Sequence, residues 1–220
     1  MKRIILLLFL PISLLAQDRP YGKIWSTRSQ VIAQNGMAAT SHPLSTQAAL
    51  DVLKAGGNAI DAAIAANAME GVVEPHVNGI GGDLYAIVWD AKTKKLYGLN
   101  GSGRSPKSLT LDEFKKRGIS HIPSRGPLPV SVPGCVDAWF ELHQKFGSMP
   151  MSKVLEKAVS YARNGFPVHG ELAHSLKNVV SLYDQYPNVA QHYYPKGQVP
   201  VEGDIFKNPN LANTLERIGK

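Results

Sequence analysis

The sequence predicts a mixed fold of α-helices and β-strands, of the α/β or α+β class. Three observations predict it. An alanine-rich apolar segment, Ala59–Met69, has the length of a buried helix. Two short apolar runs, Leu84–Trp89 and Lys95–Leu99, are separated by a polar turn, and apolar residues recur at helical spacing over 136–146 and 154–162. Of the 220 residues, 44% are hydrophobic and 19% are charged, which is typical of a globular protein and excludes a disordered one.

Charge and cysteine content exclude several classes of protein. The formal net charge is +7, but the basic residues are not gathered into one long run, so a nucleic-acid partner is not indicated. The single cysteine, Cys135, excludes an intrachain disulfide and disfavours a cysteine-based metal site. His169 and His174 lie five residues apart, which fits no usual ligand spacing. We therefore predict no metal site and no cofactor.

Residues 1–16 have the pattern of a secretory signal peptide. Two basic residues precede the apolar run Ile4–Leu10, and the small residue Ala16 stands at the expected cleavage point. The stretch is too short for a confident transmembrane span, although a buried helix or a retained anchor is the alternative. We expect a mature chain of residues 17–220 without a stable membrane span, in the periplasm or secreted.

The first elements of the mature chain are expected before residue 56. Apolar residues over 31–39 predict a short strand, which a turn at Thr40–Pro43 follows. Ser45 can cap a helix that runs to about Ala55, where two glycines stop it.

The second predicted helix begins at Asn58, whose side chain can cap it, with Asp61 in its first turn. Nine of the eleven residues in Ala59–Met69 are apolar and six are alanine. A helix that is apolar nearly all round is buried, and its small side chains would let it lie close to a sheet. Asp61, Asn67 and Glu70 interrupt it, which disfavours a membrane span.

A hairpin follows a glycine-rich loop. Asn78–Gly82 contains three glycines, so it is neither helix nor regular strand. Leu84–Trp89 and Lys95–Leu99 then form two strands joined by Asp90–Lys94. A short helix is expected at Leu111–Lys116.

The remaining helices are predicted from spacing and from glycine stops. Pro123–Pro133 holds four prolines and must be a loop or an extended segment. Helices follow over 136–146 and 154–162, each ending near a glycine. Beyond Gly165 the signals weaken, and Asn208–Lys220 starts a helical pattern without a closing cap. We expect that end to be an interruption rather than a domain boundary.

Two glycine-rich loops beside the hairpin are the most informative feature for function. Gly79–Gly82 enters the first strand and Gly101–Gly103 leaves the second, and glycine lets a backbone approach a ligand closely. Arg104 follows directly, where it can bind a carboxylate through a bidentate pair, unless it pairs with an internal acid or lies in solvent. Cys135 begins a helix, which can lower the pKa of a thiol, but a buried and unreactive cysteine is the favoured interpretation.

Several motifs, in order along about residues 34–220, resemble the N-terminal part of γ-glutamyltransferases. They are Gly36-Met37-Ala38-Ala39 with His42-Pro43, Leu53–Ala63, Val73-Glu74-Pro75, Gly79-Ile80-Gly81-Gly82, Val132-Pro133-Gly134, Gly165–Val168 and Leu211–Leu215.

The resemblance implies an Ntn-hydrolase fold, a four-layer αββα sandwich, of which residues 17–220 would be the incomplete N-terminal portion of the large-subunit domain. The family makes one precursor that cleaves itself, and the threonine that opens the small subunit is the nucleophile, with its own α-amine as base. No residue of this chain is then catalytic, because the nucleophile is expected beyond Lys220. The implied activity is cleavage of γ-glutamyl amides such as glutathione, with transfer of the acyl group to an amino acid or water. The implied partners are this small-molecule substrate and the small subunit from the same precursor.

The second glycine-rich loop departs from the family pattern. Typical members have Arg-Glu-x-Ala-Pro there, and that arginine holds the α-carboxylate of the γ-glutamyl group. Here the stretch Ser102–Pro106 reads Ser-Gly-Arg-Ser-Pro, so Ser102 takes the place of the arginine and Arg104 is shifted by two residues. We expect Arg104 and Ser102 to be the substrate-binding residues. The alternatives are an amidohydrolase or acylase of the same family that acts on another small acidic amide, or a non-catalytic solute-binding homologue.

Overall fold

The computed structural model describes residues 31–183, 186–194 and 197–220, apart from the side chains of residues 179 and 181. The predicted signal peptide therefore lies outside the described residues. The chain forms two units, Met1–Asn35 and Gly36–Lys220. The described part of the first unit has no helix or strand, and the second unit holds all the elements below.

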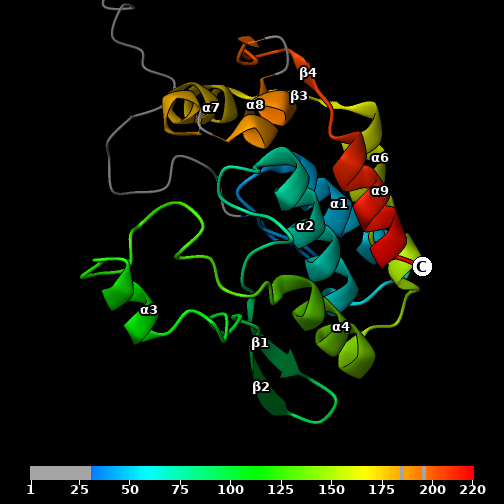
Figure 1. Cartoon of the computed structure of the whole chain (residues 1–220). Coiled ribbons are helices and arrows are strands. Elements are labelled where there is room, and N and C mark those ends of the chain that lie inside the picture. The colour runs from blue at the N-terminus through cyan, green and yellow to red at the C-terminus, as the bar shows by residue number, and fades with distance from the viewer. Residues whose placement is uncertain (1–30, 184–185, 195–196) are drawn as a thin grey trace, which may run out of the picture. The chain divides into compact units, whose positions relative to one another are not determined.

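The second unit is built mainly of helices, with two small antiparallel sheets (Figure 1). Its described helices are α1 (Pro43–Lys54), α2 (Ala59–Val73), α3 (Leu111–Lys116), α4 (Cys135–Phe146), α5 (Met151–Val154), α6 (Glu156–Asn164), α7 (Gly170–Tyr183), α8 (Pro187–Tyr193) and α9 (Pro209–Ile218). Its described strands are β1 (Tyr85–Asp90), β2 (Lys95–Asn100), β3 (Phe166–Pro167) and β4 (Ile205–Phe206).

Helix α1 begins earlier than its sequence predicts. His42, not Ser45, is the N-cap: its Nδ1 accepts a hydrogen bond from the Leu44 amide at 3.1 Å, and its carbonyl accepts the first helical bonds. Pro43 can occupy the first helical position because an amide there would have no helical partner. Ser45 is buried inside the first turn. The predicted strand over 31–39 is wrong, because those residues have no regular structure.

Helix α2 is the centre of the core, and its capping box confirms the prediction. The Asn58 side chain accepts from the amides of Ile60 and Asp61, and the Asp61 carboxylate accepts from the Asn58 amide at 2.9 Å. The helix is buried nearly all round, as its composition predicts. Its main neighbours among the described elements are α1, α4, α5 and α6, so its small side chains allow close packing among helices. The packing of this helix on a sheet stays a prediction.

The hairpin lies where the sequence predicts it. Strands β1 and β2 pair antiparallel from Tyr85↔Asn100 to Asp90↔Lys95. Side chains alternate between faces along a strand, so one face, with Ala86, Val88 and Leu99, packs against the core. The opposite face is apolar and exposed; it presents Tyr85, Ile87, Trp89 and Leu96.

The second half of the unit departs from the predicted pattern in three places. The helix expected over 154–162 is divided at Leu155 into α5 and α6. The apolar pattern over 136–146 includes both Trp139 and Phe140, but on α4 Trp139 is buried whereas Phe140 is 44% exposed. Helix α9 has a C-cap, because the Gly219 amide donates to the carbonyls of Leu215 and Arg217.

Candidate functional site

The two glycine-rich loops meet at one end of the hairpin. The Gly101 amide donates to the carbonyl of Leu84 at 2.7 Å. The amides of Gly134 and Cys135, at the start of α4, donate to the carbonyl of Gly82 at 3.2 and 3.0 Å. The turn before β1, the loop after β2 and the start of α4 therefore form one backbone-bonded junction.

Glycine is required at this junction mainly because the chain packs against itself. A Cβ atom on Gly103 would overlap the carbonyl of Val132, and one on Gly134 would overlap the carbonyl of Gly101. By contrast, a Cβ on Gly79 or Gly81 would meet nothing within 4 Å. We expect these glycines to let the backbone approach a ligand, but at Gly103 the close neighbour is the backbone of Val132. Of the glycines in the two loops, only Gly79 and Gly81, in the first loop, leave open space beside the backbone.

Both predicted substrate-binding residues lie on the loop that leaves β2. Arg104 is exposed, and its guanidinium forms no hydrogen bond or ion pair with any described residue. The alternative in which a protein acid neutralises Arg104 therefore has no support in the described part of the chain. The Ser102 amide donates to Asn100 Oδ1 at 2.9 Å, and the described residues offer its hydroxyl no partner.

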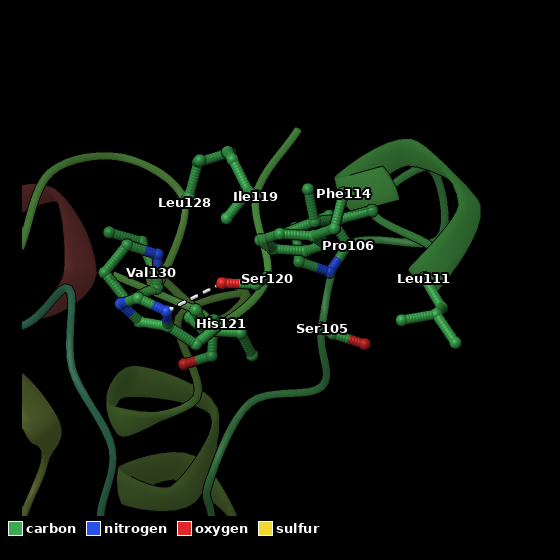
Figure 2. A pocket seen from close by; sticks show the side chains of 13 residues that line it. Ser105, Pro106, Leu111, Phe114, Ile119, Ser120, His121, Leu128 and Val130 are labelled. Atoms are coloured by element: carbon green, nitrogen blue, oxygen red, sulfur yellow. Dashed lines mark hydrogen bonds between the residues drawn. The ribbon is translucent and has the colours of Figure 1, made fainter. Parts of the chain in front are cut away.

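An apolar groove of about 390 Å³ begins at the residue after Arg104 (Figure 2). Ser105 and Pro106 form one side, and Phe114 of α3 is the buried side chain of its wall. The few polar side chains on it include Ser120 and His121, which are hydrogen-bonded to each other at 3.2 Å. Ser131 is also polar, and the remaining lining is apolar: Leu109, Leu111, Ile119, Ile122, Leu128, Pro129 and Val130. The exposed Arg104 guanidinium and an apolar groove are thus adjacent along the chain.

A buried acid pair that the sequence analysis missed lies at the C-terminal end of α2. Glu70 and Glu74 are both 7% exposed, and both accept a hydrogen bond from the Ser41 hydroxyl. His42 and His169 lie beside them, with ring centroids 4.7 Å apart. Two glutamates four residues apart at the end of an apolar helix are the sequence signal for this pair.

The two carboxyls of this pair have opposite pKa shifts. Burial, a hydrogen bond with Glu74 and the charge of Glu74 raise the pKa of Glu70. Burial also opposes the ionisation of Glu74, but hydrogen bonds from Glu70 and Ser41 and the charges of the two histidines outweigh it, so the pKa of Glu74 is lowered. Burial and the neighbouring His169 lower the pKa of His42. The opposite shifts mean that the two carboxyls lose their protons at different pH values, Glu74 before Glu70, and that between these values they share one proton.

We expect Glu70→Gln to stabilise the folded protein by an amount that grows with pH. Because the pKa of Glu70 is raised on folding, its favourable contribution is present below its unfolded pKa and is lost as pH rises through the folded pKa. Glutamine never ionises, so it avoids that loss. Urea unfolding at pH 4.5 and pH 8 measures the difference in the free energy of unfolding between the variant and wild type. Glu171→Gln, at an exposed position, is the control. A difference that does not change with pH would contradict the expectation.

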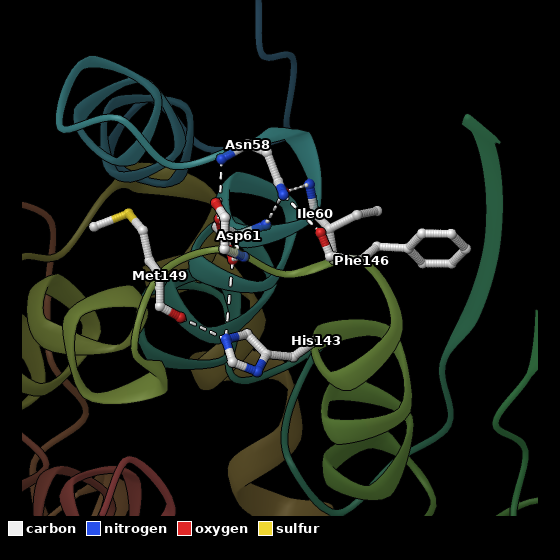
Figure 3. A network of polar contacts seen from close by, with 7 residues as sticks. Asn58, Ile60, Asp61, His143, Phe146 and Met149 are labelled. Carbon is white, nitrogen blue, oxygen red and sulfur yellow. Dashed lines mark hydrogen bonds and ion pairs between the residues drawn. The ribbon is translucent and has the colours of Figure 1, made fainter. Parts of the chain in front are cut away.

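A second buried polar network lies at the other end of α2 (Figure 3). Asp61 is fully buried and accepts from the Ser148 amide at 3.1 Å and from the Ser148 hydroxyl at 2.6 Å. Asn58 Nδ2 donates to the Phe146 carbonyl at 2.6 Å, and His143 Nε2 lies 2.6 Å from the Met149 carbonyl. These contacts hold the end of α4 against the start of α2, so this network is structural.

Cys135 is a buried thiol and not a nucleophile. It is 1% exposed, and its Sγ donates to Asn67 Oδ1, which also accepts from Trp139 Nε1 at 2.8 Å. Burial and the charge of Asp83 raise the pKa of Cys135 from 9.0 to about 11. The helix start therefore does not activate this cysteine.

Cys135 should accordingly resist alkylation in the folded protein. A pKa of about 11 instead of 9.0 lowers the thiolate fraction at pH 8 by about 100-fold, and burial slows access further. Iodoacetamide modification of the peptide that contains Cys135, followed by mass spectrometry with and without urea, measures this. Equal rates in both conditions would contradict the assignment.

Neither a metal-binding cluster nor a membrane-spanning helix is found among the described residues. Among them, no group of three or more His, Cys, Asp or Glu side chains could hold a metal ion. None of the helices described is long and apolar enough to cross a membrane.

Comparison with known proteins identifies the family. A family profile described as Gamma-glutamyltranspeptidase matches residues 45–220. The chain belongs to the gamma-glutamyltranspeptidase family. The glutathione hydrolase-like YwrD proenzyme of Bacillus subtilis is 38% identical over 191 residues, which are 86% of this chain and 36% of that protein. The oxamate amidohydrolase proenzyme of Klebsiella pneumoniae is 32% identical over 196 residues, which are 86% of this chain and 37% of that protein. The chain thus spans about a third of the length of these relatives.

Solved structures confirm the expected fold. Cephalosporin acylase from Bacillus halodurans is 42% identical with a TM-score of 0.83, over 91% of this chain and 38% of that one. Helicobacter pylori gamma-glutamyltranspeptidase is 30% identical with a TM-score of 0.81, over 87% of this chain and 56% of that one. The chain therefore has the fold of the N-terminal part of the large subunit in this Ntn-hydrolase family. The described residues contribute helices and two two-stranded sheets to that sandwich.

Proposed function

We propose that the protein is an autoprocessed gamma-glutamyltranspeptidase-like enzyme that cleaves γ-glutamyl amides and passes the acyl group to an amino acid or water. The chain would supply part of the large subunit, and the nucleophilic threonine would belong to the small subunit. Arg104 would bind the substrate carboxylate, with Ser102 on the same loop. The observation that carries this proposal is the exposed Arg104 guanidinium, free of described protein partners, on a loop fixed by the hairpin junction.

The exposed apolar face of the hairpin supports a subunit partner. Tyr85, Ile87, Trp89 and Leu96 are each more than 60% exposed, and a two-stranded ribbon of this kind is marginally stable alone. The rest of the precursor, including the small subunit, would cover this face.

The leader over 1–16 supports an exported, periplasmic or secreted enzyme, and the intact mass of the exported protein should lack those residues.

One specific alternative is an amidohydrolase or acylase that acts on another small acidic amide. The shifted position of Arg104 and the apolar groove beside it favour this candidate, because the groove suits an apolar acyl or amine portion. A non-catalytic solute-binding protein would keep the scaffold without the chemistry.

Full-length protein tests these possibilities together. Its self-cleavage is followed by mass spectrometry, and amide hydrolysis is measured with glutathione, a γ-glutamyl anilide and oxamate. Self-cleavage with γ-glutamyl turnover supports the main proposal, and turnover of oxamate alone supports the alternative. An uncleaved protein that turns over none of them would support the binding homologue and overturn the proposal.

A further inference from the structure

Asp83 joins three chain segments at the hairpin junction. It stands between Gly82 and the start of β1, and its Oδ1 accepts hydrogen bonds from the Gly103 amide and from the Ser131 hydroxyl, both at 3.2 Å. One carboxylate oxygen therefore ties the entry of β1 to the loop after β2 and to the loop before α4.

These contacts bracket the backbone of Arg104. Asp83 holds the amide of Gly103, the residue directly before Arg104. The carbonyl of Arg104 accepts from the Val132 amide at 2.9 Å, so the chain is held on both sides of the Arg104 Cα. Gly103 also packs so closely on Val132 that a Cβ would not fit. The main chain of Arg104 is thus held in place while its guanidinium forms no bond with any described residue.

Asp83 does not neutralise Arg104. No ion pair within 4 Å joins the two side chains, although both are described and exposed. The Asp83 carboxylate instead accepts from a backbone amide and a hydroxyl, and its charge also acts on the start of α4, where it contributes to the raised pKa of Cys135. An acid in this position orders the loop and leaves the cation available to a ligand.

We infer that Asp83 is a positioning residue for substrate recognition: by holding Gly103 and Ser131 it orients Arg104 toward the carboxylate of an acidic amide substrate. This inference rests on the proposed role of Arg104. A bidentate arginine–carboxylate pair depends strongly on geometry, so a loop that is held before binding loses less freedom when the substrate binds.

The test uses the full-length processed enzyme and two amide substrates that differ only in whether the carboxylate is free or converted to a neutral amide. Asp83→Ala should raise KM for the free carboxylate by about tenfold, with little change in kcat or in KM for the neutral substrate. Asp83→Asn keeps the Oδ1 acceptor and should recover most of the loss. Ser131→Ala removes one of the two donors and should have a smaller effect.

Asp90→Ala is the matched control. Asp90 lies at the other end of β1 and also accepts two local hydrogen bonds, from the Lys92 amide at 3.0 Å and the Thr93 hydroxyl at 2.6 Å. It does not contact the Arg104 loop, so its loss should leave the preference for the carboxylate unchanged. In Arg104→Ala enzyme, adding Asp83→Ala should change that preference no further.

The outcomes separate the inference from the proposed function. If Arg104→Ala abolishes the preference for the carboxylate and Asp83→Ala does not reduce it, the positioning role is wrong and the proposed site stands. If Arg104→Ala has no effect on the preference, the proposed site fails and the inference fails with it. If Asp83→Ala does not mature, Ser131→Ala decides, because it removes one of the two contacts of Asp83: a KM for the free carboxylate that equals wild type then overturns the inference. Equal losses with both substrates also overturn it, because a structural role alone would produce them.

Discussion

Asp61→Ala is expected to lower the free energy of unfolding by about 3 kcal/mol, because it leaves the Ser148 amide and hydroxyl and the Asn58 amide without their shared acceptor. Asp61 is fully buried, so water cannot replace the lost bonds. Urea unfolding of the full-length protein at pH 7 measures the loss. Asp51→Ala is the control, since its contacts with Gln47 and Lys157 are partly exposed to water and should contribute about 0.5–1 kcal/mol or less.

The effect of Asp61→Ala should also depend on pH. Burial by itself raises the pKa of Asp61, but hydrogen bonds from Ser148, Asn58 and Met149 outweigh it and lower the pKa. A lowered pKa means that the stabilisation is present above the unfolded value of 3.8 and is lost as pH falls through the folded value. The gap between wild type and variant should therefore narrow below pH 4. A gap that stays constant down to pH 2 would show that Asp61 acts through packing alone.

Arg104→Ala should lower kcat/KM for a carboxylate-bearing amide by about 10- to 100-fold. The guanidinium has no described protein partner to leave unsatisfied, so the loss should fall on substrate binding and not on stability. Arg104→Lys restores the charge without the planar fork and should recover only part of the loss. The assay compares matched substrates with and without the carboxylate, together with the thermal unfolding midpoint of each variant.

Lys107→Ala is the control for general charge. Lys107 is exposed, lies three residues beyond Arg104 and carries the same charge, so its removal should change both substrates by less than about twofold. If Arg104→Ala weakens the two substrates equally, carboxylate recognition lies elsewhere.

The sequence predicted correctly those elements whose caps and turns are formed by neighbouring residues. The capping box of Asn58 and Asp61, the hairpin and α3 lie where neighbouring residues dictate them. One error was itself local: His42, not Ser45, caps α1, because its imidazole reaches the Leu44 amide and Pro43 suits the first turn. The other errors arose where neighbouring residues do not decide the structure. The sequence of α7 and α8 carries no clear helical signal. Strand β3 depends on a distant segment, because its Phe166 is buried against Phe206 of β4.

By itself, the sequence determined that the fold mixes helices with a hairpin, that α2 is buried, that glycine loops flank the hairpin and that Arg104 follows one of them. It also determined the family, because ordered motifs along the chain suffice for that. Only the tertiary structure decided which polar groups meet. Asp61 reaches Ser148 across 87 positions, Glu74 reaches Ser41 across 33, and Asp83 reaches Ser131 across 48. In the sequence, a carboxylate that is solvated looks the same as one that is buried and hydrogen-bonded. Its hydrogen-bond donors are brought to it by the packing of helices and by backbone contacts between distant segments, not by their spacing in the sequence.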